Sequence, residues 1–287
     1  MVSSKISKFI LFAAAIFISG CQGLLFYPSK EMVRTPADVD LTYDDIYLES
    51  ADGTKLNAWF LTVDEEVEVK GSVYFLHGNA QNISQHLASV YWLPKQGYQV
   101  FLLDYRGYGN SEGTPVLSDV LTDINAGFEF IVNHPKTQNK PLYLLGQSLG
   151  ASMSGYLAGS QPQMRDKFSA VILDAAFTSY ADASQSVASQ SWITWLFQYP
   201  VAWSMPDNYD LIDVVDKISP TPLLIIHGKQ DNIIPYQHSQ TLLAKAKQPK
   251  ALLSYNGGHI ATFTDEGNQQ LLVEFMQRYQ KAKISNK

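Results

Sequence analysis

Residues 142–152 read LYLLGQSLGAS, and this stretch gives the clearest indication of the fold. It places Ser148 between Gly146 and Gly150, where a short apolar run gives way to small residues. The pattern predicts a buried strand that turns sharply into a helix, with Ser148 on the strained turn between them. Glycines suit the positions two residues before and after, because a side chain there would be too crowded. A surface turn could have the same sequence, so the choice between a surface turn and a catalytic nucleophile depends on the rest of the chain.

The surrounding sequence alternates short apolar runs with helical patterns. We expect buried strands at 72–76, 99–104, 142–145, 170–173, 223–227 and 252–255, and helices at 83–93, from Thr114-Pro115 onward, 149–158 and 269–279. This alternation predicts an α/β fold with a mostly parallel sheet and helices on both of its faces. Two earlier runs, 44–48 and 55–62, flank Asp52-Gly53 and predict an antiparallel N-terminal hairpin at the sheet edge.

One long segment, between the fourth and fifth of these expected strands, does not follow the alternation of strands and helices. It is rich in aromatic residues, including Trp192, Trp203 and Tyr209, and it is too long for a simple connection. We interpret residues 179–221 as a small, partial cap inserted into a single domain that covers 41–287. Helical core with unusual spacing is the alternative.

Composition limits the classes of function. The chain has 287 residues, 46% of them hydrophobic, and a formal net charge of −6. The acidic balance argues against a nucleic-acid partner, and the expected partner is a small acyl substrate. No cysteine pair or histidine cluster indicates a metal site, and the glycines after residue 104 do not form a nucleotide fingerprint, so no cofactor is expected. The oligomeric state stays open.

The N-terminus predicts secretion and lipid attachment. Lys5 and Lys8 precede the apolar run 9–18, which has the length of a signal-peptide core rather than of a membrane span. Cys21, the single cysteine of the chain, follows Ile18-Ser19-Gly20 as in a bacterial lipoprotein signal. We therefore expect a signal peptide at 1–20, an acylated Cys21 and a tether at 21–40. Gln22 favours the outer membrane of the cell envelope over the inner one; a short membrane anchor or a chance cysteine is the alternative.

Two further residues complete the chemistry at Ser148. A serine nucleophile needs a base, and the base needs an orienting carboxylate. Asp231 follows the expected strand 223–227, and His259 follows the strand 252–255. Since the carboxyl ends of parallel strands share one sheet edge, Ser148, Asp231 and His259 should meet there. The order serine, acid, histidine is also that of α/β-hydrolases.

An oxyanion formed at this site needs backbone donors. One should be the N–H of Leu149, at the start of the helix after Ser148. The other should come from Asn79 or Ala80, which follow the first parallel strand, and the sequence leaves that choice open. Among the other histidines, we interpret His238 as a surface residue, His86 as part of a polar helix face and His227 as a hydrogen-bonded structural residue.

Several motifs then show a family resemblance. They are FLHGNA at 75–80, DYRGYGNSEG at 104–113, GQSLG at 146–150, HGKQD at 227–231 and GGH at 257–259. Residues 26–281 resemble the α/β-hydrolase superfamily, in particular its membrane-anchored BEM46-like branch. DAAF at 174–177 departs from the Glu-Ser-Pro-Phe that relatives often show. The resemblance implies the α/β-hydrolase fold and a serine hydrolase of esters, thioesters or amides.

The residues and the resemblance together predict an enzyme. Ser148 would attack an acyl carbonyl, His259 would take the proton and Asp231 would orient His259, most simply in a carboxylesterase or lipase-like esterase. An acyltransferase or a peptidase could use the same three residues. A surface-anchored binding protein that kept the scaffold without turnover is the alternative from another class. The sequence does not identify the substrate.

Overall fold

The computed structural model describes residues 25–189 and 198–280. The expected signal peptide 1–20, Cys21 and the aromatic residue Trp192 lie outside these described residues. The strands are Tyr27–Pro28 (β1), Tyr43–Glu49 (β2), Lys55–Leu61 (β3), Gly71–Leu76 (β4), Ala80–Gln81 (β5), Tyr98–Leu103 (β6), Leu142–Gln147 (β7), Ala170–Asp174 (β8), Leu223–Gly228 (β9) and Lys250–Tyr255 (β10). The α-helices are Ile83–His86 (α2), Leu117–Asn133 (α3), Leu149–Ser160 (α4), Pro162–Arg165 (α5), Tyr180–Ser189 (α6), Gln198–Trp203 (α7), Gln237–Lys245 (α8) and Glu266–Arg278 (α9).

Eight strands form the central sheet in the order β10-β9-β8-β7-β4-β6-β3-β2. The strands from β10 to β6 pair in parallel, whereas β3 pairs antiparallel with both β6 and β2. The predicted α/β-hydrolase fold with an antiparallel edge hairpin is therefore confirmed. Because the inner strands are buried on both faces, almost every residue in them is apolar, and this explains why their sequences read as continuous runs.

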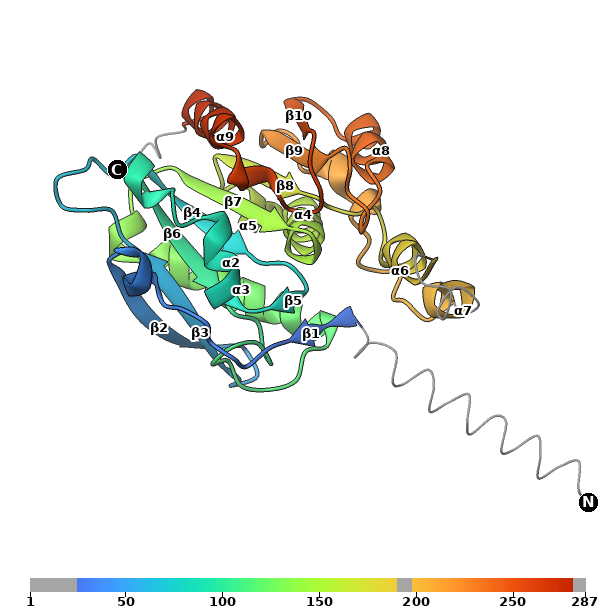
Figure 1. Cartoon of the computed structure of the whole chain (residues 1–287), viewed down its shortest axis with the longest axis horizontal. Helices are drawn as coiled ribbons and strands as arrows, with labels where there is room; N and C mark the ends of the chain where they lie inside the picture. Colours follow the sequence, from blue (N-terminus) through green and yellow to red (C-terminus); the bar gives the residue numbers. More distant parts are fainter. Residues whose placement is uncertain (1–24, 190–197, 281–287) are drawn as a thin grey trace, which may run out of the picture.

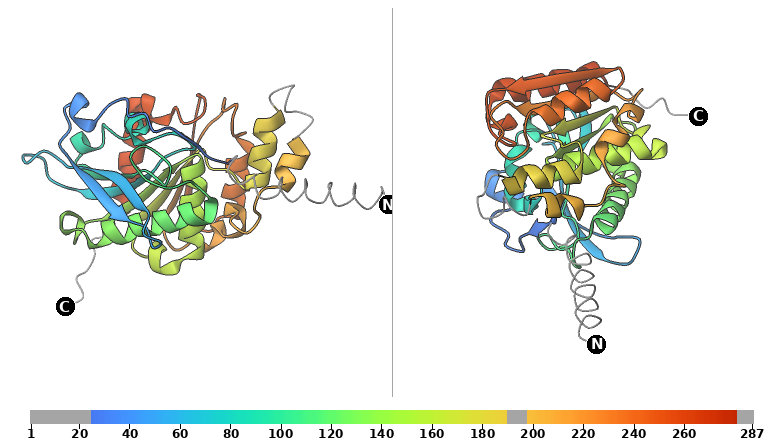
Figure 2. Two further views of the ribbon diagram at one scale, coloured as in Figure 1. Left: turned by 90° about the horizontal axis from the view of Figure 1, so that it is seen from below. Right: turned by 90° about the vertical axis from the view of Figure 1, so that its right-hand side faces the viewer.

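Helices cover the two faces of the sheet and complete two separate apolar cores. On one face, Tyr74 and Leu76 of β4 pack in the same core as residues of α3, α4 and α8. On the other face, Val73 and Phe75 pack in a second core with residues of α2 and α9. Figure 2 shows the green helices α3 and α4 on one side of the sheet and the red α9 on the other. The period of two along β4 thus decides which core each side chain joins.

Two helices near the carboxyl ends of the strands belong to the segment 179–221. Helices α6 and α7 contact each other and lie at the same end of the molecule as β1 and β5 (Figure 1). This arrangement is compatible with the expected partial cap, and the division into tether, hydrolase domain and cap stays a prediction. None of the helices in the ranges 25–189 and 198–280 is long and apolar enough to cross a membrane.

Two predicted helices differ from the observed ones. The segment 83–93 is not one helix: α2 ends at His86, and two short 3-10 helices follow at Leu87–Ser89 and Pro94–Gln96. The second prediction used Thr114-Pro115 as a helix start, but α3 begins at Leu117, and Val116 occupies the cap position without a side-chain cap. In both places, local sequence signals overstated how far the regular hydrogen bonding extends.

Candidate active site

Ser148 lies in a strained turn between β7 and α4. Its φ of 53° and ψ of −116° are sparsely populated by residues other than glycine, and its side chain is nearly buried. A Cβ on Gly146 would come within 2.5 Å of the Gly150 carbonyl oxygen, and one on Gly150 would come within 2.2 Å of the Leu76 carbonyl oxygen. The flanking glycines are therefore required by close backbone approach, which lets the serine protrude from the turn.

The structure brings Ser148, His259 and Asp231 together. His259 Nε2 lies 2.9 Å from Ser148 Oγ, and His259 Nδ1 lies 2.7 Å from Asp231 Oδ2. Because an ionised carboxylate can only accept, His259 Nδ1 must carry the proton in this pair. The lone pair of Nε2 then faces the serine hydroxyl, which is the arrangement that a general base requires.

Asp231 is held in its ionised form by its surroundings. Its Oδ1 accepts hydrogen bonds from the backbone N–H groups of Ile233 and Ile234, both at 2.9 Å. Burial by itself raises the pKa of Asp231, but hydrogen bonds from His227 and His259 outweigh it and leave the pKa below its usual range. Asp231 therefore presents a fixed negative charge to His259.

His227 is buried and structural, as its place at the end of β9 indicates. Its Nε2 lies 2.8 Å from the Ile234 carbonyl oxygen and 3.3 Å from Asp231 Oδ2, so this nitrogen carries the proton. Its Nδ1 then accepts from the hydroxyl of Ser239. His227 thereby fixes the carboxylate of Asp231 and the loop that follows it.

The loop 77–80, which carries the two candidate oxyanion donors, is held from behind by its carbonyl groups. Tyr105 donates to the carbonyl oxygen of His77 at 2.9 Å, and Nδ1 of His77 lies 2.7 Å from that of Gly78. The Tyr108 hydroxyl donates to the carbonyl oxygen of Asn79.

The last carbonyl of this loop is bound by a buried histidine. His86 Nε2 lies 3.0 Å from the carbonyl oxygen of Ala80, so it donates its proton there. All four carbonyl groups of 77–80 thus have a side-chain hydrogen-bond partner. Gly78 lies close to the serine, since a Cβ there would lie 3.6 Å from Ser148 Cβ. The loop therefore packs directly against the turn of Ser148, and the N–H groups of Asn79 and Ala80 stay the candidate oxyanion donors.

A second carboxylate, Asp174, lies beneath the site. It is completely buried and accepts hydrogen bonds from Gln147 Nε2 at 2.9 Å and from Thr262 Oγ1 at 2.8 Å. Its backbone carbonyl also accepts the N–H of Ser148 at 2.8 Å. Burial raises the pKa of Asp174 to about 6. This one residue connects the turn of Ser148 with the loop that carries His259.

Two interpretations of histidines are wrong. His86 does not lie on a polar helix face, and His238 is not a surface residue: both are buried, and both use ring nitrogens in hydrogen bonds. Their exposure depends on the packing of β5 and of the segment after β8, which sequence spacing does not report. Sequence reasoning also missed the roles of Tyr105 and Tyr108, although DYRGYGNSEG places both tyrosines directly after a buried strand at the same sheet edge.

Arg106, from the same motif, has a structural role. Its guanidinium is buried and forms a two-point ion pair with Asp123, with Nε–Oδ2 and Nη2–Oδ1 distances of 2.9 and 2.7 Å. It also contacts Asp52 at 2.8 Å. In the part of the chain that the structure describes, no group of three or more histidine, cysteine and acidic side chains is placed to hold a metal ion.

Comparisons with known proteins agree with this architecture. A model of the family described as serine aminopeptidase, S33, matches residues 67–215. The uncharacterized protein YfhR of Escherichia coli (strain K12) is 34% identical over 240 residues, which are 81% of this chain and 80% of that protein. Protein bem46 of Schizosaccharomyces pombe is 28% identical over 241 residues, 81% of this chain and 77% of that protein.

A solved structure shares the fold. The Pyrococcus furiosus esterase Pf2001 superposes with a TM-score of 0.71 at 21% identity, covering 90% of this chain and 98% of that one. At this identity the likeness concerns the fold alone, so the chemistry has to be argued from the residues of the site.

Proposed function

Because the chain belongs to the α/β-hydrolase superfamily, in its BEM46-like branch, we propose that it is a serine hydrolase that cleaves a carboxylic ester through an acyl-enzyme. The observation that carries the proposal is the continuous chain of hydrogen bonds from Ser148 through His259 to Asp231. A folded binding protein has no need for a strained serine whose hydroxyl faces the unprotonated nitrogen of a histidine.

The reaction follows from the positions of these atoms. Ser148 Oγ attacks the acyl carbonyl while His259 Nε2 takes the hydroxyl proton, and the Asp231 carboxylate stabilises the imidazolium that forms. The proton then passes from His259 to the leaving alcohol, and the acyl group stays on Ser148 as an ester. A water molecule, deprotonated by His259, releases the carboxylic acid and restores the serine.

Charge on the acyl oxygen would be stabilised by two backbone donors. The N–H of Leu149 opens α4, so the partial positive charge at the helix start adds to its hydrogen bond. Of the two candidates in the loop, we propose Asn79 over Ala80, because Asn79 directly follows Gly78, which lies against Ser148. One such donor typically contributes about 10²–10³ in rate.

Two variants test this function. With p-nitrophenyl butyrate as substrate, Ser148→Ala should lower kcat by about 10⁴-fold or more, and Asp231→Asn should lower it by about 10⁴-fold. Ser160→Ala is the matched control, because Ser160 lies at the exposed end of α4, the helix that Ser148 precedes. Circular dichroism would verify that each variant is folded. Comparable activity of Ser148→Ala and the parent chain would contradict the proposal.

Amide cleavage is the second candidate function. The family model that matches 67–215 is described as a serine aminopeptidase, and the same three residues can attack a peptide bond. Release of p-nitroaniline from aminoacyl p-nitroanilides, compared with release of p-nitrophenol from esters, distinguishes the two. The primary proposal predicts that p-nitrophenol is released from the esters faster than p-nitroaniline is released from the anilides.

We also propose that the chain is held on a membrane of the cell envelope through an acylated Cys21, with the outer membrane as the favoured site. The support is the sequence around Cys21 together with the position of β1. Phe26 is buried, and β1 pairs with β5, which begins at Ala80, the last residue of the loop 77–80. Cys21 precedes Phe26 by five residues, which can span at most about 18 Å, so Cys21 would attach the lipid close to the active-site edge.

A further inference from the structure

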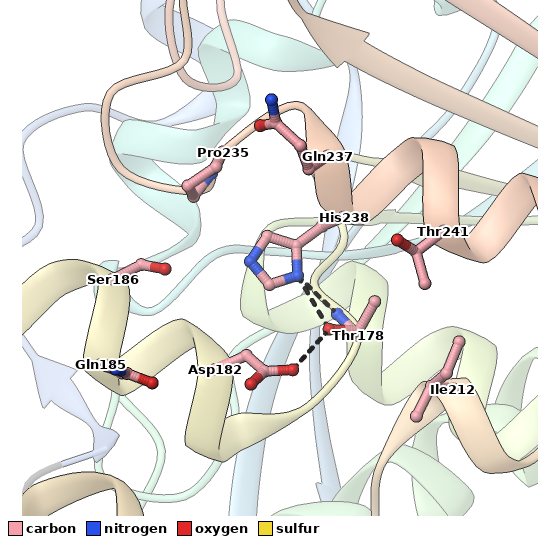
Figure 3. A pocket seen from close by; sticks show the side chains of 9 residues that line it. All are labelled: Thr178, Asp182, Gln185, Ser186, Ile212, Pro235, Gln237, His238 and Thr241. Atoms are coloured by element: carbon pink, nitrogen blue, oxygen red, sulfur yellow. Dashed lines mark hydrogen bonds between the residues drawn. The ribbon is translucent and has the colours of Figure 1, made fainter. Parts of the chain in front are cut away.

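A cavity of about 470 Å³ lies beside the candidate active site and is used by no step of the proposed reaction. Its walls come from α6, from the start of α8 and from the segments that precede them (Figure 3). Seven of its nine lining residues have polar side chains, Thr178, Asp182, Ser186, His238 and Thr241 among them, although most of the surface that they present is apolar. An open cavity of this size can hold a small group that has both carbon and polar atoms, together with water.

The cavity borders the catalytic residues through the chain itself. Ile234 donates its N–H to Asp231, and the next residue, Pro235, lines the cavity. Phe177 donates its N–H to Ser152 of α4, and the next residue, Thr178, lines the opposite side. The loops that follow β8 and β9 thus each carry a lining residue directly after a residue that is hydrogen-bonded to Ser152 or Asp231.

His238 has one ring nitrogen committed to the protein and one directed at the cavity. Its Nδ1 lies 3.2 Å from the backbone nitrogen of Thr178 and 2.8 Å from the Thr178 hydroxyl. Since a backbone N–H can only donate, Nδ1 must be the unprotonated nitrogen, and Nε2 carries the proton. Figure 3 shows this second nitrogen turned away from Thr178, toward the space between Ser186 and Pro235. Burial lowers the pKa of His238, which keeps the ring neutral.

The other polar groups of the cavity limit which ligand could accept a hydrogen bond from His238 Nε2. Asp182 accepts from the Thr178 hydroxyl at 3.1 Å through one carboxylate oxygen and is otherwise exposed to the cavity. Among the nine lining residues none is lysine or arginine, so a phosphate or carboxylate would meet Asp182 without a compensating cation. An ammonium group can donate to Asp182 but cannot accept from His238. A hydroxyl group can do both, because it is donor and acceptor at once.

We propose that this cavity binds the alcohol part of the substrate and selects a polyol such as a glyceryl group, with hydroxyls accepting from His238 Nε2 and donating to Asp182. This inference rests on the proposed ester hydrolysis and names the substrate class for it. The hydroxyl groups of Ser186 and Thr241 supply further partners, and Pro235 and Ile212 contact the carbon chain.

The test compares two esters that differ only in hydroxyl groups, glycerol monobutyrate and propyl butyrate, and measures kcat/KM for each with the full chain. The parent should prefer the glyceryl ester. His238→Asn keeps an oxygen that can accept from Thr178, but its shorter side chain has no donor at the position of Nε2, so the glyceryl-to-propyl ratio should fall by roughly three- to tenfold. Asp182→Asn should lower the ratio in the same direction. Because both esters are measured on one sample, partial unfolding cancels from the ratio.

Gln240→Ala is the matched control, since Gln240 is exposed on the same helix as His238 and does not line the cavity, and its ratio should equal that of the parent. Hydrolysis of both esters with a ratio unchanged in His238→Asn and Asp182→Asn would overturn the inference and leave the proposed function standing. Absence of hydrolysis of any ester by the parent chain would overturn the proposed function and the inference with it.

Discussion

The hydroxyl of Thr262 donates a hydrogen bond to the buried carboxylate of Asp174 across 2.8 Å. Thr262 lies three residues after His259, and Asp174 also accepts the backbone N–H of Ser148. The nucleophile turn and the histidine loop are therefore connected beneath the site by one acidic residue. A buried carboxylate of this kind costs free energy when it is ionised, so its presence has a measurable effect on stability.

Replacement of Asp174 by asparagine should change how stability depends on pH. The pKa of Asp174 is about 6 in the folded chain and about 3.8 when it is unfolded, because burial disfavours the charged form. The folded state thus binds this proton more tightly, and the stability that the group contributes is complete below about pH 4 and is lost as the pH rises through 6. Relative to Asp174→Asn, the parent should lose roughly 2 kcal/mol of unfolding free energy between pH 4 and 7.

Urea denaturation at several pH values between 4 and 7 measures this difference. Asp166→Asn is the control, since Asp166 is exposed after α5 and lies outside the site. If the parent and Asp174→Asn give parallel curves across this range, Asp174 does not titrate as described.

The close approach of the backbone to position 150 requires glycine there. Gly150→Ala would place its Cβ within 2.2 Å of the Leu76 carbonyl oxygen and within 2.4 Å of that of His77, and neither backbone atom can move cheaply. We expect a loss of at least about 3 kcal/mol in unfolding free energy or failure to fold. Gly258→Ala, whose Cβ would meet no atom within 4 Å, should stay within about 0.5 kcal/mol of the parent. Equal stability of the two variants would contradict the described turn.

The buried ion pair of Arg106 and Asp123 should stabilise the folded chain, because the guanidinium binds the buried carboxylate at two points. Arg106→Met leaves the Asp123 carboxylate buried without its cation, which typically costs about 3–5 kcal/mol. Lys136→Met breaks an exposed ion pair with Asp44 and should cost less than about 1 kcal/mol. Thermal or urea unfolding measures both, and a smaller loss for Arg106→Met than for Lys136→Met would refute this ranking.

Much of the fold is predictable from this sequence because the inner strands are buried on both faces. Runs such as 99–104 are short and almost continuously apolar, which is typical of strands buried on both faces. Helical patterns separate these runs, so a parallel sheet is the consistent solution. The same rule places Ser148, Asp231 and His259 at one sheet edge before any coordinates are known. The structure brings their side chains within hydrogen-bond distance, and their catalytic role is the proposal made above.

Features that depend on long-range packing are not predictable in this way. His238 lies between Gln237 and Ser239, and His86 follows Ser84-Gln85, yet both histidines are buried and bonded to β5 or to the segment after β8. The segment 83–93 has helical spacing but ends its first helix at His86. Tyr108 reaches the carbonyl of Asn79 from a separate loop, and neither residue indicates that contact in the sequence. The partners of His238 and Tyr108 lie 60 and 29 residues away along the chain.

If the chain is attached to the membrane through Cys21, replacing this cysteine should change the location of the protein in the cell. In bacterial cells, Cys21→Ser should abolish incorporation of labelled palmitate and move the chain out of the membrane fraction, because several acyl chains provide nearly permanent anchoring. Ser19→Ala is a suitable control, since it keeps a small residue before the cysteine. Undiminished palmitate labelling of Cys21→Ser would contradict the lipoprotein prediction.

The proposed hydrolase activity depends most on covalent chemistry at residue 148. The most direct measurement is mass spectrometry of the full chain after reaction with a fluorophosphonate, followed by peptide mapping of the adduct. We predict one adduct per chain, located on Ser148, that disappears in Ser148→Ala and is strongly slowed in His259→Ala because the hydroxyl then lacks its base. A folded parent chain that acquires no adduct, or acquires it on a different residue, would contradict the role of Ser148 as the nucleophile.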